Sequence, residues 1–159
     1  MSLENKIYLT KEGLKRFEEE FNALKKAKTA KAKSGATPSV PLQAVDSEYF
    51  TFQEDLDLLE SRIAELENVL KNYALIPLPP KSKREIVLLG ATVEVEVDGQ
   101  KDEFTIVGSL EANPMLGRIS DESLVGRALL GRRKGDEAKV SSSIITVYKI
   151  TKVTYRSWQ

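Results

Sequence analysis

A pair of acids and a run of lysines are the residues of this chain whose types and spacing could do chemistry. Asp46 and Glu48 stand two positions apart, and paired carboxylates can hold a divalent cation such as Mg²⁺. Side chains two positions apart on a helix do not face each other, which is poor geometry for sharing one ion. The interpretation that we favour is that Asp46 caps a helix and Glu48 interacts with the positive end of its dipole.

The run of lysines places five bases within nine residues, with no acid among them. It leaves three roles open: contact with a nucleic-acid phosphate backbone, a solvated face, or ion pairs with the acids of a neighbouring helix. No aromatic residue is interleaved, so the stacking platform of single-strand binders is not indicated. The run consists of Lys25, Lys26, Lys28, Lys31 and Lys33.

The residue types that are missing exclude several kinds of chemistry. The 159 residues include no cysteine and no histidine, which excludes disulfides, thiolate metal sites and histidine acid–base catalysis. No apolar run approaches the ~20 residues of a membrane span, and no signal peptide or phosphate-binding glycine loop is found. Because acids and bases balance at 24 each, the net charge does not indicate a partner. We expect a cytoplasmic non-enzyme with no catalytic residue, metal or cofactor of its own.

The element that would position the acids is a long helix, predicted over about 46–73. Its large apolar residues recur at alternating spacings of three and four, which is the seam of a coiled coil. No Gly or Pro interrupts it, and a helix of this kind needs a partner to bury its stripe. The seam consists of Tyr49, Phe52, Leu56, Leu59, Ile63, Leu66, Leu70 and Tyr73.

The partner helix is predicted over about 11–33, after Thr10 as N-cap. Apolar residues repeat from Leu14 at the same spacing, and the register then falls on two of the lysines, Lys28 and Lys31. Residues 34–45 contain one Gly and two Pro and cannot continue a helix. Two long stripes joined by one short loop predict an antiparallel coiled-coil hairpin, with the loop at its tip. We assign residues 1–76 to this domain.

The second half of the chain is predicted to be a small antiparallel sheet with one helix, after a proline-rich linker over 77–84. Its clearest signal is a period-two alternation that ends in the hairpin turn Asp98-Gly99. With the hairpin before it, the fold class is α+β, and residues 85–159 form the second domain. The predicted elements are strands at 91–97, 103–107 and within 139–153, and a helix at 121–130 that turns Leu124, Val125, Ala128 and Leu129 toward the core.

Three stretches together resemble the bacterial GreA/GreB transcription elongation factors over almost the whole chain. Residues 8–14, YLTKEGL, are similar to the family's "hydrophobic-Thr-x-x-Gly" entry to its first helix. Residues 48–49 and 58–67 resemble its second helix. The C-terminal signature is matched by the blocks GRIS at 117–120 and GRALLG at 126–131, followed by Gly-Asp.

The resemblance implies a division of labour. A C-terminal FKBP-like domain docks on the rim of the secondary channel of RNA polymerase, and the hairpin enters the channel. Two tip acids in a Gly-Asp-Leu-Ser-Glu-Asn pattern help to hold a second Mg²⁺ at the polymerase active site, where backtracked RNA is hydrolysed. RNA polymerase is thus the implied partner of a monomer, with nascent RNA as a further contact, no membrane, and no cofactor beyond that Mg²⁺. The docking residues carried over are Ser120, Glu122, Ser123, Leu124 and Arg127.

The tip departs from the family pattern. Aligned on residues 48–49, the family's tip Asp falls on Leu42 and its tip Glu on Val45, while Pro41 replaces the Gly. Neither Leu nor Val can ligate a metal. We therefore expect a Gre-like regulator that occupies the channel without stimulating cleavage. One alternative is a cleavage-stimulating factor that uses Asp46 and Glu48.

A more distant alternative is an FKBP-like chaperone or prolyl isomerase. Isomerases of this type line their pocket with several aromatic residues. Residues 85–153 contain only Phe104 and Tyr148, which argues against this alternative.

Overall fold

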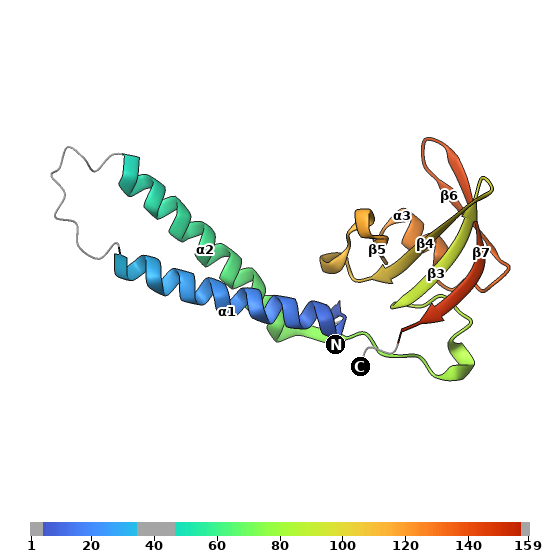
Figure 1. Cartoon of the computed structure of the whole chain (residues 1–159), viewed down its shortest axis with the longest axis horizontal. Helices are drawn as coiled ribbons and strands as arrows, with labels where there is room; N and C mark the ends of the chain where they lie inside the picture. Colours follow the sequence, from blue (N-terminus) through green and yellow to red (C-terminus); the bar gives the residue numbers. More distant parts are fainter. Residues whose placement is uncertain (1–4, 35–46, 157–159) are drawn as a thin grey trace. The chain divides into compact units, whose positions relative to one another are not determined.

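A computed structural model describes residues 5–34 and 47–156 of the chain (Figure 1). Contacts divide the chain into two compact units. One unit runs from Leu14 to Tyr73, and the other joins the residues up to Gly13 to those from Ala74 onward. The N-terminal residues thus group with the second half of the chain, whereas sequence analysis had assigned them to the hairpin domain.

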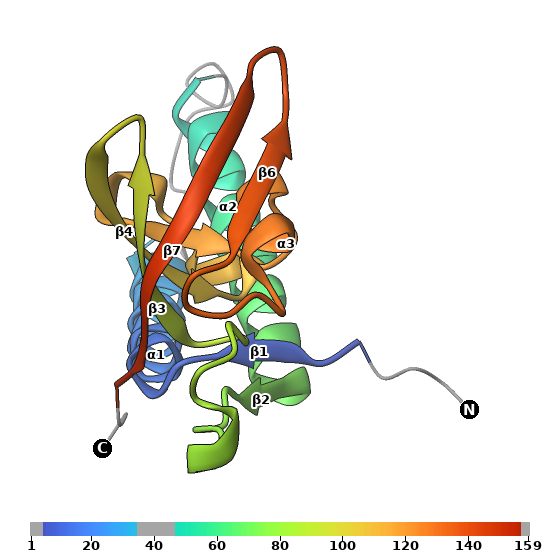
Figure 2. The same ribbon diagram turned by 90° about the vertical axis from the view of Figure 1, so that its right-hand side faces the viewer.

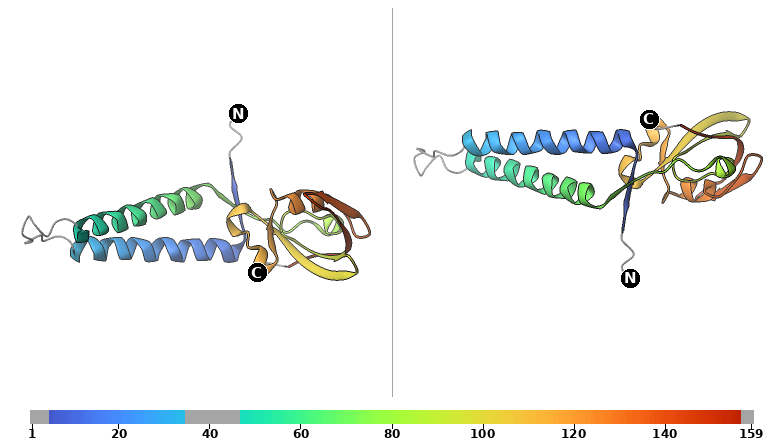
Figure 3. Two further views of the ribbon diagram at one scale, coloured as in Figure 1. Left: turned by 90° about the horizontal axis from the view of Figure 1, so that it is seen from above. Right: turned by 90° about the horizontal axis from the view of Figure 1, so that it is seen from below.

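The helical unit is the predicted antiparallel hairpin, formed by α1 (Lys11–Ser34) and α2 (Ser47–Asn72) (Figures 1 and 3). Along α2 the predicted seam residues from Phe52 to Leu70 are half-buried or buried, and Leu66 is almost completely buried, whereas Tyr49 at the start of the helix is exposed. On α1, Lys28 and Lys31 are half-buried, as the continued register requires. No helix in the described part of the chain is both long and apolar enough to cross a membrane.

Two short strands that sequence analysis did not predict form a sheet of their own. They are β1 (Ile7–Leu9) and β2 (Tyr73–Leu75). Leu9 is fully buried, and Gly108 approaches the carbonyl oxygen of Tyr8 so closely that a Cβ on it would lie 2.4 Å away. Strands of three residues carry too little periodicity to be recognised from sequence.

The other unit is built on a five-stranded sheet with the order β5-β4-β3-β7-β6 (Figures 1 and 2). Neighbouring strands are antiparallel, with one exception: β4 and β5 are parallel. The strand β5 was not predicted, and its parallel pairing with β4 departs from the predicted antiparallel arrangement. The strands are β3 (Ala91–Val97), β4 (Gln100–Val107), β5 (Arg118–Ser120), β6 (Glu137–Ser141) and β7 (Ile145–Tyr155).

The predicted turn between β3 and β4 is present. Asp98 and Gly99 both have a positive φ, 52° and 78°, and the flanking residues Val97 and Gln100 are paired. This is the backbone of a two-residue type I′ hairpin, whose twist matches that of the strands.

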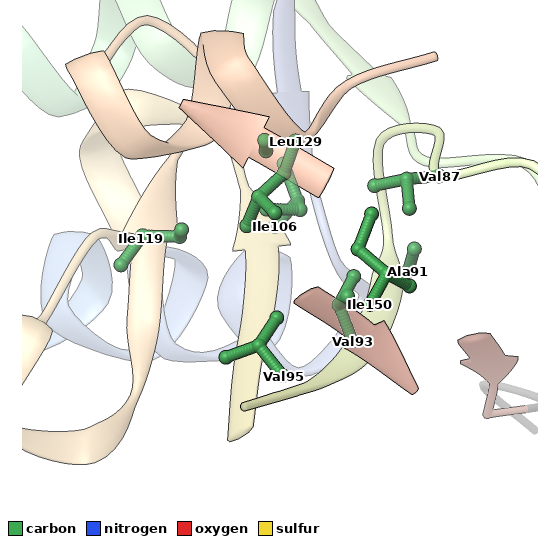
Figure 4. Close-up of a cluster of buried hydrophobic side chains, with 9 residues drawn as sticks. Val87, Ala91, Val93, Val95, Ile106, Ile119, Leu129 and Ile150 are labelled. Atoms are coloured by element: carbon green, nitrogen blue, oxygen red, sulfur yellow. The ribbon is translucent and has the colours of Figure 1, made fainter. Parts of the chain in front are cut away.

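The core lies where α3 (Leu124–Leu129) packs on the sheet (Figure 4). Leu129 is fully buried and Val125 is partly buried, but Leu124 is 63% exposed, which corrects the prediction that it faces the core. The face centred on Val125 and Leu129 turns inward, and Leu124 is one residue, about 100°, away from it. The buried cluster consists of Val87, Ala91, Val93, Val95, Ile106, Ile119, Leu129, Ala138 and Ile150.

Tyr155, the last residue of β7, forms hydrogen bonds with the segment that leads into β3. The Tyr155 hydroxyl donates to the carbonyl of Ile86 and accepts a hydrogen bond of 2.9 Å from the N–H of Leu88. Between them, Val87 exchanges backbone hydrogen bonds with the turn after α3. Burial raises the pKa of the Tyr155 phenol, and the hydrogen bond from Leu88 opposes that shift.

A buried carboxylate lies at the start of α1. Glu111, only 4% exposed, accepts hydrogen bonds from the N–H and the hydroxyl of Thr10, at 2.7 and 2.6 Å. The Thr10 hydroxyl in turn accepts the N–H of Gly13 at 2.9 Å, which confirms Thr10 as the N-cap. A Cβ on Gly13 would lie 2.1 Å from a Glu111 oxygen, so any larger residue there would force the buried carboxylate to move.

Replacing Gly13 with alanine is expected to lower the free energy of unfolding by about 1–3 kcal/mol, because the new methyl group must displace the buried carboxylate. In an ordinary helix the same change stabilises by up to about 1 kcal/mol. Urea denaturation of Gly13→Ala in the wild-type and Glu111→Ala backgrounds measures both effects. We expect the sign to reverse in the Glu111→Ala background; equal effects in the two backgrounds would contradict the contact.

Replacing Tyr155 with phenylalanine is expected to lower the free energy of unfolding by about 1–3 kcal/mol, because the carbonyl of Ile86 and the N–H of Leu88 lose their hydrogen-bond partner. The pKa of this phenol is raised by folding, so its contribution is fully present below about pH 10 and is lost as the pH rises through the raised value. Denaturant unfolding at pH 8 and pH 11 measures the difference in the free energy of unfolding between wild type and Tyr155→Phe, and this difference should be smaller at pH 11. Tyr148→Phe in the same strand is the control, and a gap that is the same at both pH values would refute this account.

Candidate functional site

The predicted tip falls largely outside the described residues. Leu42, Val45 and Asp46 are all in the segment that the structure does not describe. Glu48 belongs to the first turn of α2, which begins at Ser47, but its side chain is likewise not described. The assignment of Asp46 as a helix cap and the replacement of the family's tip acids therefore remain predictions from sequence.

The structure joins two of the five lysines to acids of the other helix. Lys31 Nζ lies 2.8 Å from a carboxylate oxygen of Asp55 and 5.4 Å from the ring centroid of Phe52. Lys28 Nζ lies 3.3 Å from a carboxylate oxygen of Glu60. For these two lysines the geometry favours the role of ion pairs across the hairpin.

The remaining lysines of the run are not joined to acids of the other helix in the described part of the chain. Lys25 Nζ lies 4.9 Å from the ring centroid of Phe21 on its own helix. Lys26 and Lys33 are exposed, and neither forms an ion pair with any of the described residues. If the run contacts a phosphate backbone, Lys26 and Lys33 are the lysines best placed to do so.

The five predicted docking residues lie close together in sequence, from the last residue of β5, Ser120, to Arg127 in α3. Hydrogen bonds fix the shape of this segment, residues 120–124. The Ser109 hydroxyl donates to Glu122 Oε2 at 2.9 Å, so it accepts the Ser120 hydroxyl, also at 2.9 Å. The N–H of Glu122 donates to Ser120 Oγ at 3.1 Å. Ser109 was missed by sequence analysis because it follows β4 in a short turn with no motif around it.

A second set of hydrogen bonds ties the same segment to α3. The Ser123 hydroxyl donates to the carbonyl of Ser120 at 2.7 Å and accepts the N–H of Gly126 at 3.0 Å, so Ser123 is the N-cap. A Cβ on Gly126 would lie 2.0 Å from the Ser120 carbonyl oxygen, which requires glycine there. Arg127 and Leu124 are exposed. The segment is therefore held by several hydrogen bonds, with the exposed apolar side chain of Leu124 at its end and the exposed cation of Arg127 in the following turn of α3.

The two aromatic residues considered for an isomerase pocket pack on each other. The rings of Phe104 and Tyr148 meet edge to face, with centroids 6.1 Å apart, and both lie against the buried cluster. Their contact explains them as packing residues. Among the described residues, no group of three or more acids, histidines or cysteines is placed to hold a metal ion.

The chain is similar to known proteins in sequence and in structure. The chain is 38% identical over 134 residues to the transcription elongation factor GreA of Thermomicrobium roseum, covering 82% of this chain and 85% of that protein. It is 41% identical over 146 residues to GreA of Clostridium acetobutylicum, covering 89% and 91%. The family model "Transcription elongation factor, GreA/GreB, C-term" matches residues 81–155. Among solved structures, the crystal structure of GreA factor homolog 1 (Gfh1) of Thermus thermophilus matches with 24% identity and a TM-score of 0.43, covering 94% of this chain and 99% of that chain.

The lysine pairs can be tested by their effect on stability. Lys31→Ala removes an ion pair and a cation–π contact, and we expect it to lower the free energy of unfolding by about 0.5–1.5 kcal/mol. Lys26→Ala on the same helix should change it by less than about 0.5 kcal/mol. Thermal unfolding of both variants by circular dichroism, at low and high salt, provides the comparison. Equal effects of the two substitutions would contradict the pairing role of Lys31.

Proposed function

This chain belongs to the GreA/GreB family of transcription elongation factors, and from that premise we propose that it inserts its hairpin into the secondary channel of RNA polymerase without stimulating transcript cleavage. The second half of the proposal is supported by the alignment on residues 48–49, in which Leu42 and Val45 stand where the family has its tip acids. Their hydrocarbon side chains offer no oxygen to a metal, so the tip would bring no ligand for a second Mg²⁺. In this proposal the protein is not itself an enzyme and carries no cofactor.

The proposed docking element is the segment 120–124 together with Arg127. The hydrogen bonds of Ser109, Ser120 and Ser123 support this role, because they hold the loop in one conformation before any partner arrives. A preorganised loop loses less conformational entropy on binding than a flexible one. Leu124, the residue whose predicted burial was corrected, supplies an exposed apolar side chain that a partner surface could cover.

The proposed role of the hairpin is to reach into a narrow channel. With 24 residues, α1 is about 36 Å long at ~1.5 Å per residue. A rod of this length in the channel would exclude other factors and obstruct the entry of nucleotides by its volume alone. Lys26 and Lys33 are the proposed contacts to nascent RNA, and their contribution to binding should weaken with rising salt.

A transcript-cleavage assay on a backtracked polymerase complex tests the proposal. Wild-type protein is expected to bind core polymerase but leave the cleavage rate at its intrinsic value. The variant Leu42→Asp with Val45→Glu should raise the rate at least tenfold, about 1.4 kcal/mol of barrier, because it restores two carboxylates to the tip. The matched control is Leu42→Asn with Val45→Gln, which has similar size without the charge and should gain nothing.

Two results would contradict the proposal in different ways. Cleavage stimulated by wild-type protein and abolished by Asp46→Ala with Glu48→Ala would show that those two acids act from a remodelled tip. Failure of wild-type protein to bind polymerase at all would refute the docking and insertion steps together.

A further inference from the structure

The strand β6 is the last strand at one side of the five-stranded sheet, and in the described part of the chain no further strand pairs with its outer edge (Figure 2). The side chains of Ala138 and Val140 are buried, while those of Glu137, Lys139 and Ser141 are exposed. An open edge offers a row of backbone N–H and C=O groups to another chain, and charged side chains are one means of protecting it. The charges of β6 therefore either protect this edge or guide a partner strand to it.

The hydrogen bonds between β6 and β7 indicate which backbone groups point toward the open edge. Just before β6, the N–H of Gly135 donates to the carbonyl of Ile150 at 2.8 Å, and the N–H of Ile150 donates to the carbonyl of Asp136 at 2.9 Å. Bonded and non-bonded pairs alternate along an antiparallel ladder, so Ala138 is the next residue that is bonded to β7. The residues on either side of Ala138 consequently direct their N–H and C=O groups away from β7, toward the edge.

A row of alternating charges crosses four strands on the exposed face of the sheet and ends at this edge. Glu96 of β3 lies directly opposite Lys101 of β4 on one side and Lys149 of β7 on the other. Lys149 in turn lies opposite Glu137 of β6. Opposite charges in such positions stabilise strand pairing. Glu137 is the last member of the row, and neither Glu137 nor Lys139 forms an ion pair with any of the described residues.

We propose that β6 pairs with β6 of a second copy of this chain, antiparallel and centred on Ala138, so that the two sheets become one. In this register Glu137 of each copy lies opposite Lys139 of the other copy. Both residues direct their backbone groups to the edge, so each of these pairs exchanges N–H···O=C hydrogen bonds. The row of alternating charges thereby continues into the second copy. This pairing goes beyond the proposed function, for which the family resemblance implied a monomer.

Charge complementarity selects this register among those that keep the exposed face of both sheets on the same side. A ladder centred on Lys139 would place two lysines directly opposite each other, and one centred on Glu137 would do the same with two glutamates. Like charges in directly opposed positions destabilise a strand pair. Only the ladder centred on Ala138 matches each acid with a base among these three, which is why a second copy is the occupant that fits the edge.

The test uses two charge reversals in the full-length protein and measures self-association by sedimentation equilibrium. Glu137→Lys and Lys139→Glu each place like charges opposite each other in the proposed dimer, so each alone should weaken self-association about tenfold or more. An equal mixture of the two variants, with one of them fluorescently labelled, should form a heterodimer whose affinity is within about threefold of the wild-type dimer, because every cation again meets an acid.

The matched controls are Glu94→Lys and Lys152→Glu, which make the same charge changes on the same face. These two residues lie opposite each other on β3 and β7, away from the edge. Each control should change the self-association constant by less than about twofold. The thermal midpoint of every variant verifies that it is folded.

Three results would overturn the proposal. Wild-type protein that stays monomeric up to about 0.5 mM would refute the pairing, since weaker association than this has little specificity. Self-association that neither reversal weakens, or that the mixture does not restore, would assign the contact to another surface. Stronger self-association of Lys139→Ala than of wild type would show that Lys139 protects the edge, whereas the proposed pairing requires Lys139→Ala to weaken it.

Discussion

The buried carboxylate of Glu111 is the constraint on which the start of the first helix depends. A carboxylate with so little exposure must find donors inside the protein, and Thr10 supplies two of them, 101 positions away in the chain. The same contact means that a side chain at Gly13 would have to displace the carboxylate. It therefore explains the threonine and the glycine of the opening motif by one physical cause, and it explains why the first turn of α1 groups with the sheet by its contacts.

The hydrogen bonds around Ser120 serve a comparable purpose at the candidate docking site. They use hydroxyl groups of three serines to fix a loop that has no hydrophobic core of its own, which leaves the apolar side chain of Leu124 free to face solvent. The division between rigid support and exposed apolar tip is what a docking element requires. The hairpin differs in this respect, because most of its apolar residues pack within the hairpin itself.

Much of the fold follows from local pattern. The seam of α2, the register that brings Lys28 and Lys31 inward, and the Asp98-Gly99 turn were all predictable, because each depends on residues near in sequence. The three-residue strands β1 and β5, the partner of Glu111 and the contact of Ser109 were not, because they depend on residues distant in sequence or on segments too short to show a period. The predicted burial of Leu124 was wrong for a different reason. Leucine is a typical core residue, but α3 begins at Leu124 and turns a neighbouring face inward.

The gradient of burial along α2 has a consequence for how the two helices come apart. Leu66 and Val69, toward the end of the helix, are buried, Phe52 and Leu56 are half-buried, and Tyr49 near its start is more than half exposed. Toward that start, apolar packing gives way to pairs such as Lys31 with Asp55, which water and salt weaken. The free energy needed to separate the two helices is therefore smallest near the start of α2 and increases toward Asn72. Backbone amides near the start of α2 should exchange with solvent first, and those near Asn72 last.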